Sequence, residues 1–414
     1  MSEMSYLEKL LDGAEVQWEK LGDVLQRTKG TKITAGQMKA LHKDNAPLKI
    51  FAGGKTVAFV DFKDIPEKDI NREPSIIVKS RGVIEFEYYD KPFSHKNEMW
   101  SYHSNNDAIS IKYIYYFLKT NEGYFQKIGS KMQMPQIATP DTDMFEIPIP
   151  CPDNPAKSLA IQSEIVRILD KFSELTAELT AELTAELTMR KKQYNYYRDQ
   201  LLSFDEEQEK PVYLEKLLDG VEVEWRNLGD TSLFEIANNG RKPVKASLRI
   251  AGETPYYGAN NIQDYVDGYT HDGEYVLIAE DGSASLENYS IQYATGKFWA
   301  NNHVHVVRGK ERVHSRFLYH YLCIVNFLPF LTGGGRAKLT KGQLIEIPVP
   351  IPCPDNPAKS LAIQSEIVRI LDKFDTLTNS ITEGLPREIE LRQKQYEYYR
   401  DLLFSFPKPE TASN

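Results

Sequence analysis

Residues 151–172 read CPDNPAKSLAIQSEIVRILDKF, and the same letters return without a change at 353–374. A second pair has the same offset, because MRKKQYNYYRDQLLSF at 189–204 returns as LRQKQYEYYRDLLFSF at 391–406. A third pair opens each half of the chain: YLEKLLDGAEVQWEKLGD at 6–23 and YLEKLLDGVEVEWRNLGD at 213–230. Repetition at this distance indicates one supersecondary unit used twice. The chain therefore contains two copies of a common scaffold.

The long repeated block predicts a helix with a defined start. Asn154-Pro155 and Asn356-Pro357 each place an N-cap residue before a proline at the first helical position. A helix from 155 to 204 would be about 75 Å long at 1.5 Å per residue. Its apolar stripe is expected to continue through Leu175, Leu179, Leu183, Leu187, Tyr194 and Tyr197. Together with Tyr396 and Tyr399 of the second copy, these are the residues that we expect to pair the helices and bind partner proteins.

Two such helices would bury their stripes against each other as an antiparallel coiled coil. The stretch between the matched blocks has equal length in both copies but different letters, TAEL repeats in the first and DTLTNSITEGLPREIE in the second. This pattern is typical of a spacer, although a coiled coil without a measuring role is the alternative. Gly384 and Pro386 should interrupt the second helix. Each TAEL unit adds about 6 Å and drifts the stripe by about 40°.

The two segments between the repeats show little mutual similarity. Both predict mixed α/β structure, with strands in PSIIVKSRGVIEFEYY, EYVLIAEDG and HVHVVRG and a helix before each exit, at 111–120 and 315–331. The fold class is α+β, with two mixed α/β domains joined by two long helices and related by pseudo-twofold symmetry. The predicted regions are a short repeat at 1–23, a variable domain at 24–145, a central repeat at 146–210, a second short repeat at 211–230, a variable domain at 231–345 and a C-terminal repeat at 346–414.

Charge separates the variable segments from the scaffold. The formal net charge is −9, which by itself argues against a DNA-binding protein. Segment 24–145 nevertheless carries 18 Lys and Arg against 14 Asp and Glu, and segment 231–345 carries 12 against 10. The rest of the chain is therefore strongly acidic. This distribution favours two DNA-facing domains on a frame that contacts protein.

Polar clusters near turns are the best candidates for DNA contact, because Asn and Gln read adenine while Arg and Lys read guanine or bind phosphate. In the first segment these are Lys55, Thr56, His95, Lys96, Asn97, Lys127, Lys131 and Gln133. In the second segment they are Asn260, Asn261, Asn301, Asn302, His303, Arg336, Lys338 and Lys341. The alternative is that most of them lie in ordinary solvated loops. The tyrosines of the exit helices are expected in the core.

No catalytic motif is found. The chain lacks the N-P-P-[YF] motif of an adenine methyltransferase, and AGGKT lacks the first glycine of a P-loop. The three cysteines form no zinc pattern, so we expect no metal site, and the acids around Glu85 and Glu87 resemble a nuclease site only loosely. No apolar run is long enough for a membrane span, and the N-terminus does not resemble a signal peptide. A cytoplasmic recognition protein is expected.

At this point a family resemblance is specific. Two dissimilar domains between repeated helices resemble the specificity subunit (HsdS) of type I restriction-modification enzymes, and the TAEL run with SLAIQSEIVRILDKF and MRKKQYNYYRDQLLSF is similar to the type IC subgroup. The resemblance implies double-stranded DNA with a split target, the N-terminal domain reading the 5′ half. It also implies two HsdM-type methyltransferase subunits that use S-adenosylmethionine, and HsdR-type restriction subunits that use ATP and Mg²⁺, with no cofactor in this chain.

Two other interpretations remain open from the sequence. The first is a self-contained two-domain nuclease or methyltransferase, which would cut or methylate DNA without partners. The second is a structural coiled-coil adaptor, whose variable segments would bind no duplex with sequence preference.

Overall fold

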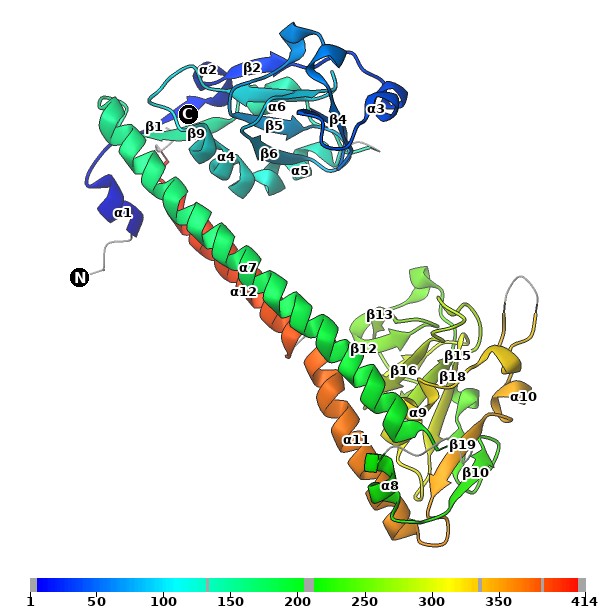
Figure 1. Cartoon of the computed structure of the whole chain (residues 1–414). Helices are drawn as coiled ribbons and strands as arrows, with labels where there is room; N and C mark the ends of the chain where they lie inside the picture. Colours follow the sequence, from blue (N-terminus) through cyan, green and yellow to red (C-terminus); the bar gives the residue numbers. More distant parts are fainter. Residues whose placement is uncertain (1–5, 132–133, 205–211, 334–336, 381–382, 409–414) are drawn as a thin grey trace. The chain divides into compact units, whose positions relative to one another are not determined.

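The computed structural model describes residues 6–131, 134–204, 212–333, 337–380 and 383–408. It divides into two compact units (Figure 1). The first unit comprises Met1–Glu182 together with Ile389–Asn414, and the second comprises Leu183–Glu388. The C-terminal segment of the chain therefore completes the unit that contains the N-terminus.

The described residues of the first unit form three sheets. The strand orders are β2-β8-β5-β6, β4-β3-β7 and β1-β9. The helices are α1 (Tyr6–Leu11), α2 (Leu21–Val24), α3 (Ala35–Leu41), α4 (Ile111–Thr120), α5 (Glu122–Gly129), α6 (Thr139–Asp143), the first part of α7 (Pro155–Leu202) and most of α12 (Leu385–Leu403). The strands are β1 (Val16–Lys20), β2 (Gln26–Lys29), β3 (Leu48–Phe51), β4 (Val57–Val60), β5 (Ser75–Lys79), β6 (Glu85–Tyr89), β7 (Phe93–His95), β8 (Trp100–His103) and β9 (Glu146–Pro150).

The second unit also contains three sheets, with the orders β11-β18-β15-β16, β13-β12-β17-β14 and β10-β19. Its helices are the last part of α7, α8 (Val212–Leu218), α9 (Ser315–Leu322), α10 (Lys341–Leu344) and α11 (Pro357–Asn379). Its strands are β10 (Val223–Asn227), β11 (Phe234–Ile236), β12 (Ala251–Tyr257), β13 (Ile262–Val266), β14 (His271–Asp272), β15 (Tyr275–Ala279), β16 (Ile291–Ala294), β17 (Lys297–Ala300), β18 (Val304–Gly309) and β19 (Pro348–Pro352).

The two variable segments share one topology, which their sequences conceal. In the four-stranded antiparallel sheet of the first unit, β2 pairs with β8, β8 with β5, and β5 with β6. The second unit repeats these pairings, because β11 pairs with β18, β18 with β15, and β15 with β16. In each second sheet a strand pairs antiparallel with its successor and parallel with a later strand, as β3 does with β4 and β7, and β12 with β13 and β17. The second segment adds only the short strand β14 to this plan. Two unrelated sequences therefore form the same kind of domain.

The repeated blocks form the same local structures in both units. β1 pairs with β9 and β10 pairs with β19, both antiparallel, with Trp18 opposite Pro148 and Trp225 opposite Pro350. The predicted helix starts are confirmed, because Asn154 Oδ1 accepts the N–H of Lys157 and Asn356 Oδ1 accepts that of Lys359. The proline-rich lead-in is thus an edge strand that delivers the chain to a capped helix.

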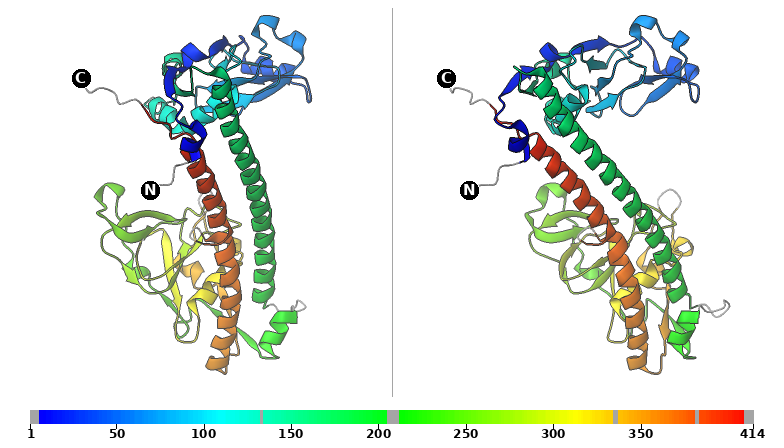
Figure 2. Two further views of the ribbon diagram at one scale, coloured as in Figure 1. Left: turned by 90° about the vertical axis from the view of Figure 1, so that its left-hand side faces the viewer. Right: turned by 60° about the vertical axis from the view of Figure 1, so that its left-hand side comes forward.

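The predicted antiparallel helix pair is present within each unit (Figure 2). In the first unit α7 contacts α12, with Phe172 and Tyr399 ring centroids 5.7 Å apart and Ser173 hydrogen-bonded to the Tyr396 hydroxyl at 3.0 Å. In the second unit the end of α7 contacts α11 through Tyr197 and Phe374, with centroids 5.5 Å apart. The aromatic pairs occupy equivalent positions in the two copies. The repeat therefore makes the same contact twice.

Two expectations need correction or refinement. The helix expected at 315–331 ends at Leu322, because the N–H groups of Ile324 and Val325 bond back only three residues and Pro329 follows. The leucine stripe does not keep one face, since Leu175 is 47% exposed while Leu179, Leu183 and Leu187 are half-buried. A step of four residues overshoots one helical turn, which explains the drift.

The interruption of the second long helix lies where the sequence predicted it. α11 ends at Asn379 and α12 begins at Leu385, and Gly384 has a φ of +80°. A Cβ atom at Gly384 would lie 2.5 Å from the carbonyl oxygen of Thr376, so the position suits only glycine. The first copy, by contrast, forms the single helix α7 of 48 residues.

Each unit has its own core, and the last residues of one long repeated block complete that core. Leu403, Phe404 and Phe406 join the core that contains Leu7, Tyr113 and Phe117. The equivalent segment Leu201, Leu202 and Phe204 joins the core of the second unit. Among the described residues, no helix combines the length and apolar character required to cross a membrane.

Candidate nucleic-acid interface

In the second unit, three polar segments that are distant in sequence meet around the turn that follows β15. Asn260 reaches this turn from the β12–β13 connection, accepting the N–H of Ala284 at 2.8 Å and donating to the carbonyl of Gly282 at 2.9 Å. The β17–β18 connection joins through the bond from Glu280 N–H to the carbonyl of His303, at 2.8 Å. The third segment, near Lys338, forms a β-bridge with Asp281.

Charged side chains hold this turn together. Glu280 pairs with Arg241 at 2.6 Å and with Lys338 at 3.0 Å, and the ring Nδ1 of His303 lies 2.6 Å from Oδ1 of Asp281. Burial alone would raise the pKa of Glu280, but the hydrogen bonds from Arg241 and Lys338 outweigh it and lower that pKa. The carboxylate is therefore ionised and fixes two cations at the surface of the turn.

The first unit builds the same arrangement from other residues. The N–H of Lys96 donates to the carbonyl of Phe51, as Asn301 does to Tyr257. The β3–β4 turn is closed by a bond from Ala52 to Thr56, and the β12–β13 turn by one from Gly258 to Asn261.

A third connection is equivalent as well. In the first unit, the N–H of Ile137 donates to the carbonyl of Ser80, and Arg81 forms a β-bridge with Gln136. In the second unit, the N–H of Leu339 donates to the carbonyl of Glu280, and Asp281 forms a β-bridge with Lys338. The segments after α5 and after η5 (Leu328–Phe330) therefore approach the same turn in the two domains. Among the described residues selected from sequence, Lys55, Thr56, Lys96, Asn97, Asn260, Asn261, Asn301, Asn302, His303 and Lys338 lie in these connections, while the others lie in adjoining elements or beside them.

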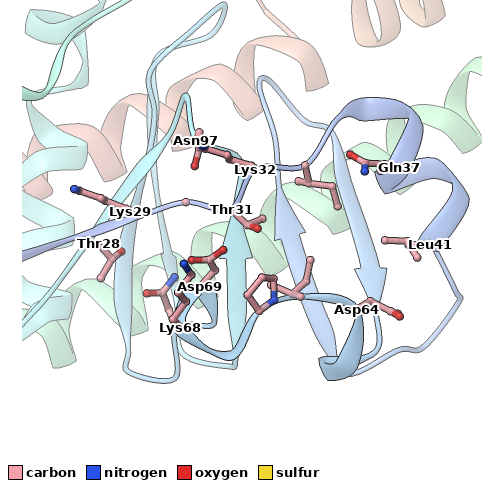
Figure 3. Close-up of a pocket in the computed structure, with 15 residues that line it drawn as sticks. Thr28, Lys29, Thr31, Lys32, Gln37, Leu41, Asp64, Lys68, Asp69 and Asn97 are labelled. Carbon is pink, nitrogen blue, oxygen red and sulfur yellow. The ribbon is translucent and has the colours of Figure 1, made fainter.

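A hollow of about 840 Å³ lies beside the β7–β8 connection of the first unit (Figure 3). Its lining includes Lys29, Lys32, Lys68 and Asn97, all exposed, together with Thr28, Thr31 and two acidic residues, Asp64 and Asp69. Asn71 also lines it, and the buried Nδ2 of this side chain has no hydrogen-bond partner among the described residues. Three lysines against two acidic residues give the lining of the hollow a small excess of positive charge.

The predicted residues of the first unit are distributed unequally. Asn97 lines the hollow, Lys55 and Thr56 are exposed on the β3–β4 turn, and Lys127 and Lys131 are exposed at the end of α5 and just after it. Lys96 is half-buried and pairs with Glu98 at 2.6 Å. Gln133 lies outside the described residues.

His95 is not at the surface. It is fully buried, with Nε2 3.2 Å from the Ser101 hydroxyl and Nδ1 3.2 Å from the carbonyl of Lys96. Burial lowers the pKa of His95, so the ring is neutral. Its expected contact with DNA is therefore corrected to a structural role beneath the β7–β8 connection.

In the second unit one prediction changes similarly. Asn301 is 3% exposed, and its Oδ1 accepts the N–H of His303, so it shapes the connection from inside. Asn261, Asn302, His303, Lys338 and Lys341 are exposed. The side chain of Asn260 already uses its oxygen and nitrogen within the turn. Arg336 lies outside the described residues.

The sequence interpretation missed a basic segment beside these connections. Lys242 and Lys245 are exposed, and Lys242 N–H bonds to the carbonyl of Ala300, as Thr31 bonds to His95 in the first unit. The run GRKPVK at 240–245 was the available signal. In the first unit the same path is taken by Lys29 and Lys32.

The acidic residues that resemble a nuclease site have another role. Glu85 and Glu87 both pair with the buried amine of Lys79, at 2.6 and 2.8 Å. No cluster of three or more histidine, cysteine or acidic side chains suited to a metal ion occurs in the part of the chain that the structure describes. These acids compensate a buried lysine.

The tyrosines expected to dock partners lie partly inside the helix pairs. Tyr194 is 9% exposed and Tyr396 is half-buried, whereas Tyr197 and Tyr399 remain 45% and 41% exposed while contacting phenylalanines. More exposed side chains on the same helices are Tyr196, Tyr398 and Met189.

Comparison with known proteins agrees with this architecture. The model of the type I restriction modification DNA specificity domain matches residues 15–189 and again 221–391. A type I restriction enzyme specificity subunit of Escherichia coli is 39% identical over the full length of both chains. A putative specificity subunit of Haemophilus influenzae is 62% identical over 47% of this chain and 49% of that protein.

Solved structures agree at the level of the fold. The S subunit of a type I restriction-modification system from M. genitalium has 19% identity and a TM-score of 0.50, covering 98% of this chain and all of that chain. A chain from a study of type I system assembly has 13% identity and a TM-score of 0.54, covering 94% and 97%. The chain belongs to the family of type I restriction-modification DNA specificity subunits, the recognition rather than the catalytic component of these enzymes.

Proposed function

We propose that the chain reads a split DNA target, each recognition domain binding one half and the N-terminal domain binding the 5′ half. The observation that carries the proposal is the use of the same three connections by the polar side chains of both domains. Family membership supplies the class of ligand, since the E. coli and H. influenzae relatives are specificity subunits of type I restriction enzymes.

Within each domain, lysines would bind phosphates while amides and hydroxyls read base edges. The path of Lys29 and Lys32 in the first unit, and of Lys242 and Lys245 in the second, is suited to the phosphate backbone. Asn97, Asn261, Asn302 and the basic residues of the neighbouring connections are the proposed base-reading groups. Backbone contacts would set the register, and the connections would give the sequence preference.

The repeated helices are proposed to fix the gap between the two halves of the target. The continuous helix α7 contributes to both units, which supports a role as spacer. Inserting one TAEL unit should lengthen the gap and leave both half-sites unchanged. Mapping of methylated sites in cells that carry the lengthened chain would test this.

The exposed tyrosines and leucines of α7 and α12 are proposed to bind two HsdM-type methyltransferase subunits, with HsdR-type restriction subunits joining the complete enzyme. S-adenosylmethionine, ATP and Mg²⁺ would then be bound by those partners. This chain would contribute recognition and spacing.

The decisive experiment maps methylated adenines in cells that express the chain with the methyltransferase subunits of its own system. A single bipartite motif is expected. Replacing residues 24–145 by the corresponding segment of another family member should change only the 5′ half of that motif. A change in both halves, or in neither, would contradict the modular reading of the target.

A further inference from the structure

The two recognition domains contain equivalent helices, α4 and α9, which contact the repeated helices α7 and α11. Aligned from their N-caps, residues 112–118 read KYIYYFL and residues 316–322 read RFLYHYL. The N-caps are Ser110 and His314. Elsewhere the domains differ, so the shared feature lies where each domain meets its scaffold.

A buried glutamine of the first repeat binds the main chain just before α4. Gln162 is fully buried, its Oε1 accepts the N–H of Ser110 at 2.9 Å, and its Nε2 donates to the carbonyl of Ala108 at 3.0 Å. The same Nε2 lies 3.0 Å from the hydroxyl of Ser158, one turn earlier on α7. The amide is therefore held in one orientation from its own helix.

The second repeat makes the same contact with a different sequence. Gln364 is fully buried, its Oε1 accepts the N–H of His314 at 2.8 Å, and its Nε2 donates to the carbonyl of Arg312 at 3.2 Å. Ser360 orients it at 3.0 Å. Within the described residues, the hydrogen bonds of both glutamines to the recognition domain go to main-chain atoms, so these bonds do not depend on the identity of the side chains there.

Two helical turns after the glutamine, each repeat carries an aspartate whose carboxylate binds two side chains of the recognition-domain helix. Asp170 pairs with Lys112 at 2.7 Å and accepts the hydroxyl of Tyr116 at 2.6 Å. Asp372 pairs with Arg316 at 2.8 Å and with His320 at 2.7 Å. In both cases the cation is the second residue of the domain's helix and the other partner is the sixth.

We propose that Ser158, Gln162 and Asp170, and equally Ser360, Gln364 and Asp372, form a docking clamp that fixes the orientation of a recognition domain of unrelated sequence. The partner it fits is a helix whose N-cap N–H is free, with a lysine or arginine at the second position and a hydrogen-bond donor at the sixth. These are positioning residues, and they act on DNA reading through the domain that they hold. This inference rests on the proposed function.

The test uses the full chain with its methyltransferase subunits and two mirrored variants, Gln162→Met and Gln364→Met. Each removes both main-chain bonds of one clamp with little change in side-chain volume. We expect methylation of sites mismatched in the 5′ half to rise about tenfold relative to cognate sites for Gln162→Met, while discrimination at the other half stays unchanged. Gln364→Met should show the reverse. Lys171→Ala, on the exposed side of the same helix, is the control.

A charge-reversal pair tests the carboxylate. Lys112→Glu should weaken 5′ discrimination, and adding Asp170→Lys should restore it, which a general loss of stability would not allow. The proposal would be overturned if a single glutamine variant lost discrimination at both halves of the target, or if both glutamine variants discriminated as the wild type does. It would also be overturned if Asp170→Lys did not restore the discrimination lost in Lys112→Glu.

Hydrogen exchange on the full chain provides a readout that does not depend on DNA. Gln162→Met should speed exchange of the first amides of α4 and leave those of α9 unchanged. If the wild-type chain directs no bipartite methylation, the proposed function fails, whereas this measurement still decides whether the clamp exists.

Discussion

The scaffold of this protein repeats letters, whereas its two recognition domains repeat only topology. Phe172 contacts Tyr399 in the first unit as Phe374 contacts Tyr197 in the second, and the residues are identical at equivalent positions. In the domains the strand pairings agree while the side chains differ, so that Ser80 in one corresponds to Glu280 in the other. Backbone hydrogen bonds define the domain, and side chains of the connections are left to vary.

This contrast explains how the protein can keep its assembly while changing its target. The side chains that vary between the two domains include those on turns that the sheets hold in place, which is the usual position of binding residues on a rigid scaffold. The repeated glutamine and aspartate contacts isolate that variation from the helices. The following predictions test how independent the two units are.

The largest effect is expected from the phenylalanines that close the two cores. Phe406→Ala should destabilise the first unit and Phe204→Ala the second, each by about 3–5 kcal/mol, because both side chains are buried and equivalent. Hydrogen exchange resolved by segment would measure both. Loss of protection throughout the chain in either variant would show that the units do not unfold separately.

A smaller effect is expected at the turn where the domains differ. Glu280→Gln removes the ionised partner of Arg241 and Lys338 and should cost the second unit about 1–3 kcal/mol. Non-specific DNA binding should become tighter, because two cations are released. Denaturant unfolding and fluorescence anisotropy would measure the two consequences, and weaker DNA binding would contradict this explanation.

Acid should affect the second unit more than the first. Burial lowers the pKa of His95 in the first unit and of both His305 and His320 in the second. Each is neutral when folded and gains a proton on unfolding below about pH 6.5, so stability is present above that pH and falls as pH decreases toward the folded pKa.

The maximum slope is about 1.4 kcal/mol per pH unit for each histidine. Unfolding of each unit followed between pH 7 and 5 should therefore show the steeper loss in the second. His320→Gln should reduce the slope of the second unit alone. Equal slopes in the two wild-type units would contradict the assignment.

The smallest effects are expected at exposed lysines. Lys242→Ala in the second domain and Lys32→Ala in the first should each reduce the slope of log binding constant against log salt by about 0.9, the loss of one phosphate contact. Both should leave the methylated motif unchanged. If either variant altered the methylated motif, the replaced lysine would be assigned to base reading and not to phosphate binding.

The scaffold could be predicted closely because its letters repeat and its helix starts carry explicit caps. The exit helix at 111–120 and the strands around 75–89 were also predictable from periodicity. The shared topology of the domains was not, because main-chain pairing leaves no trace in the side chains of two divergent sequences. The burial of His95 and Asn301 was equally hidden, since a polar residue near a turn can face inward when the sheet provides partners for it.

The division of the chain also has a consequence for biosynthesis. The second unit is a continuous stretch, Leu183–Glu388, and can assemble as soon as it leaves the ribosome. The first unit lacks Leu403, Phe404 and Phe406 until the whole second unit has been made, although most of its residues precede the second unit. The first unit, which begins before the second unit in the chain, is therefore completed after it, and a nascent chain stalled before Ile389 would expose an unfinished apolar surface.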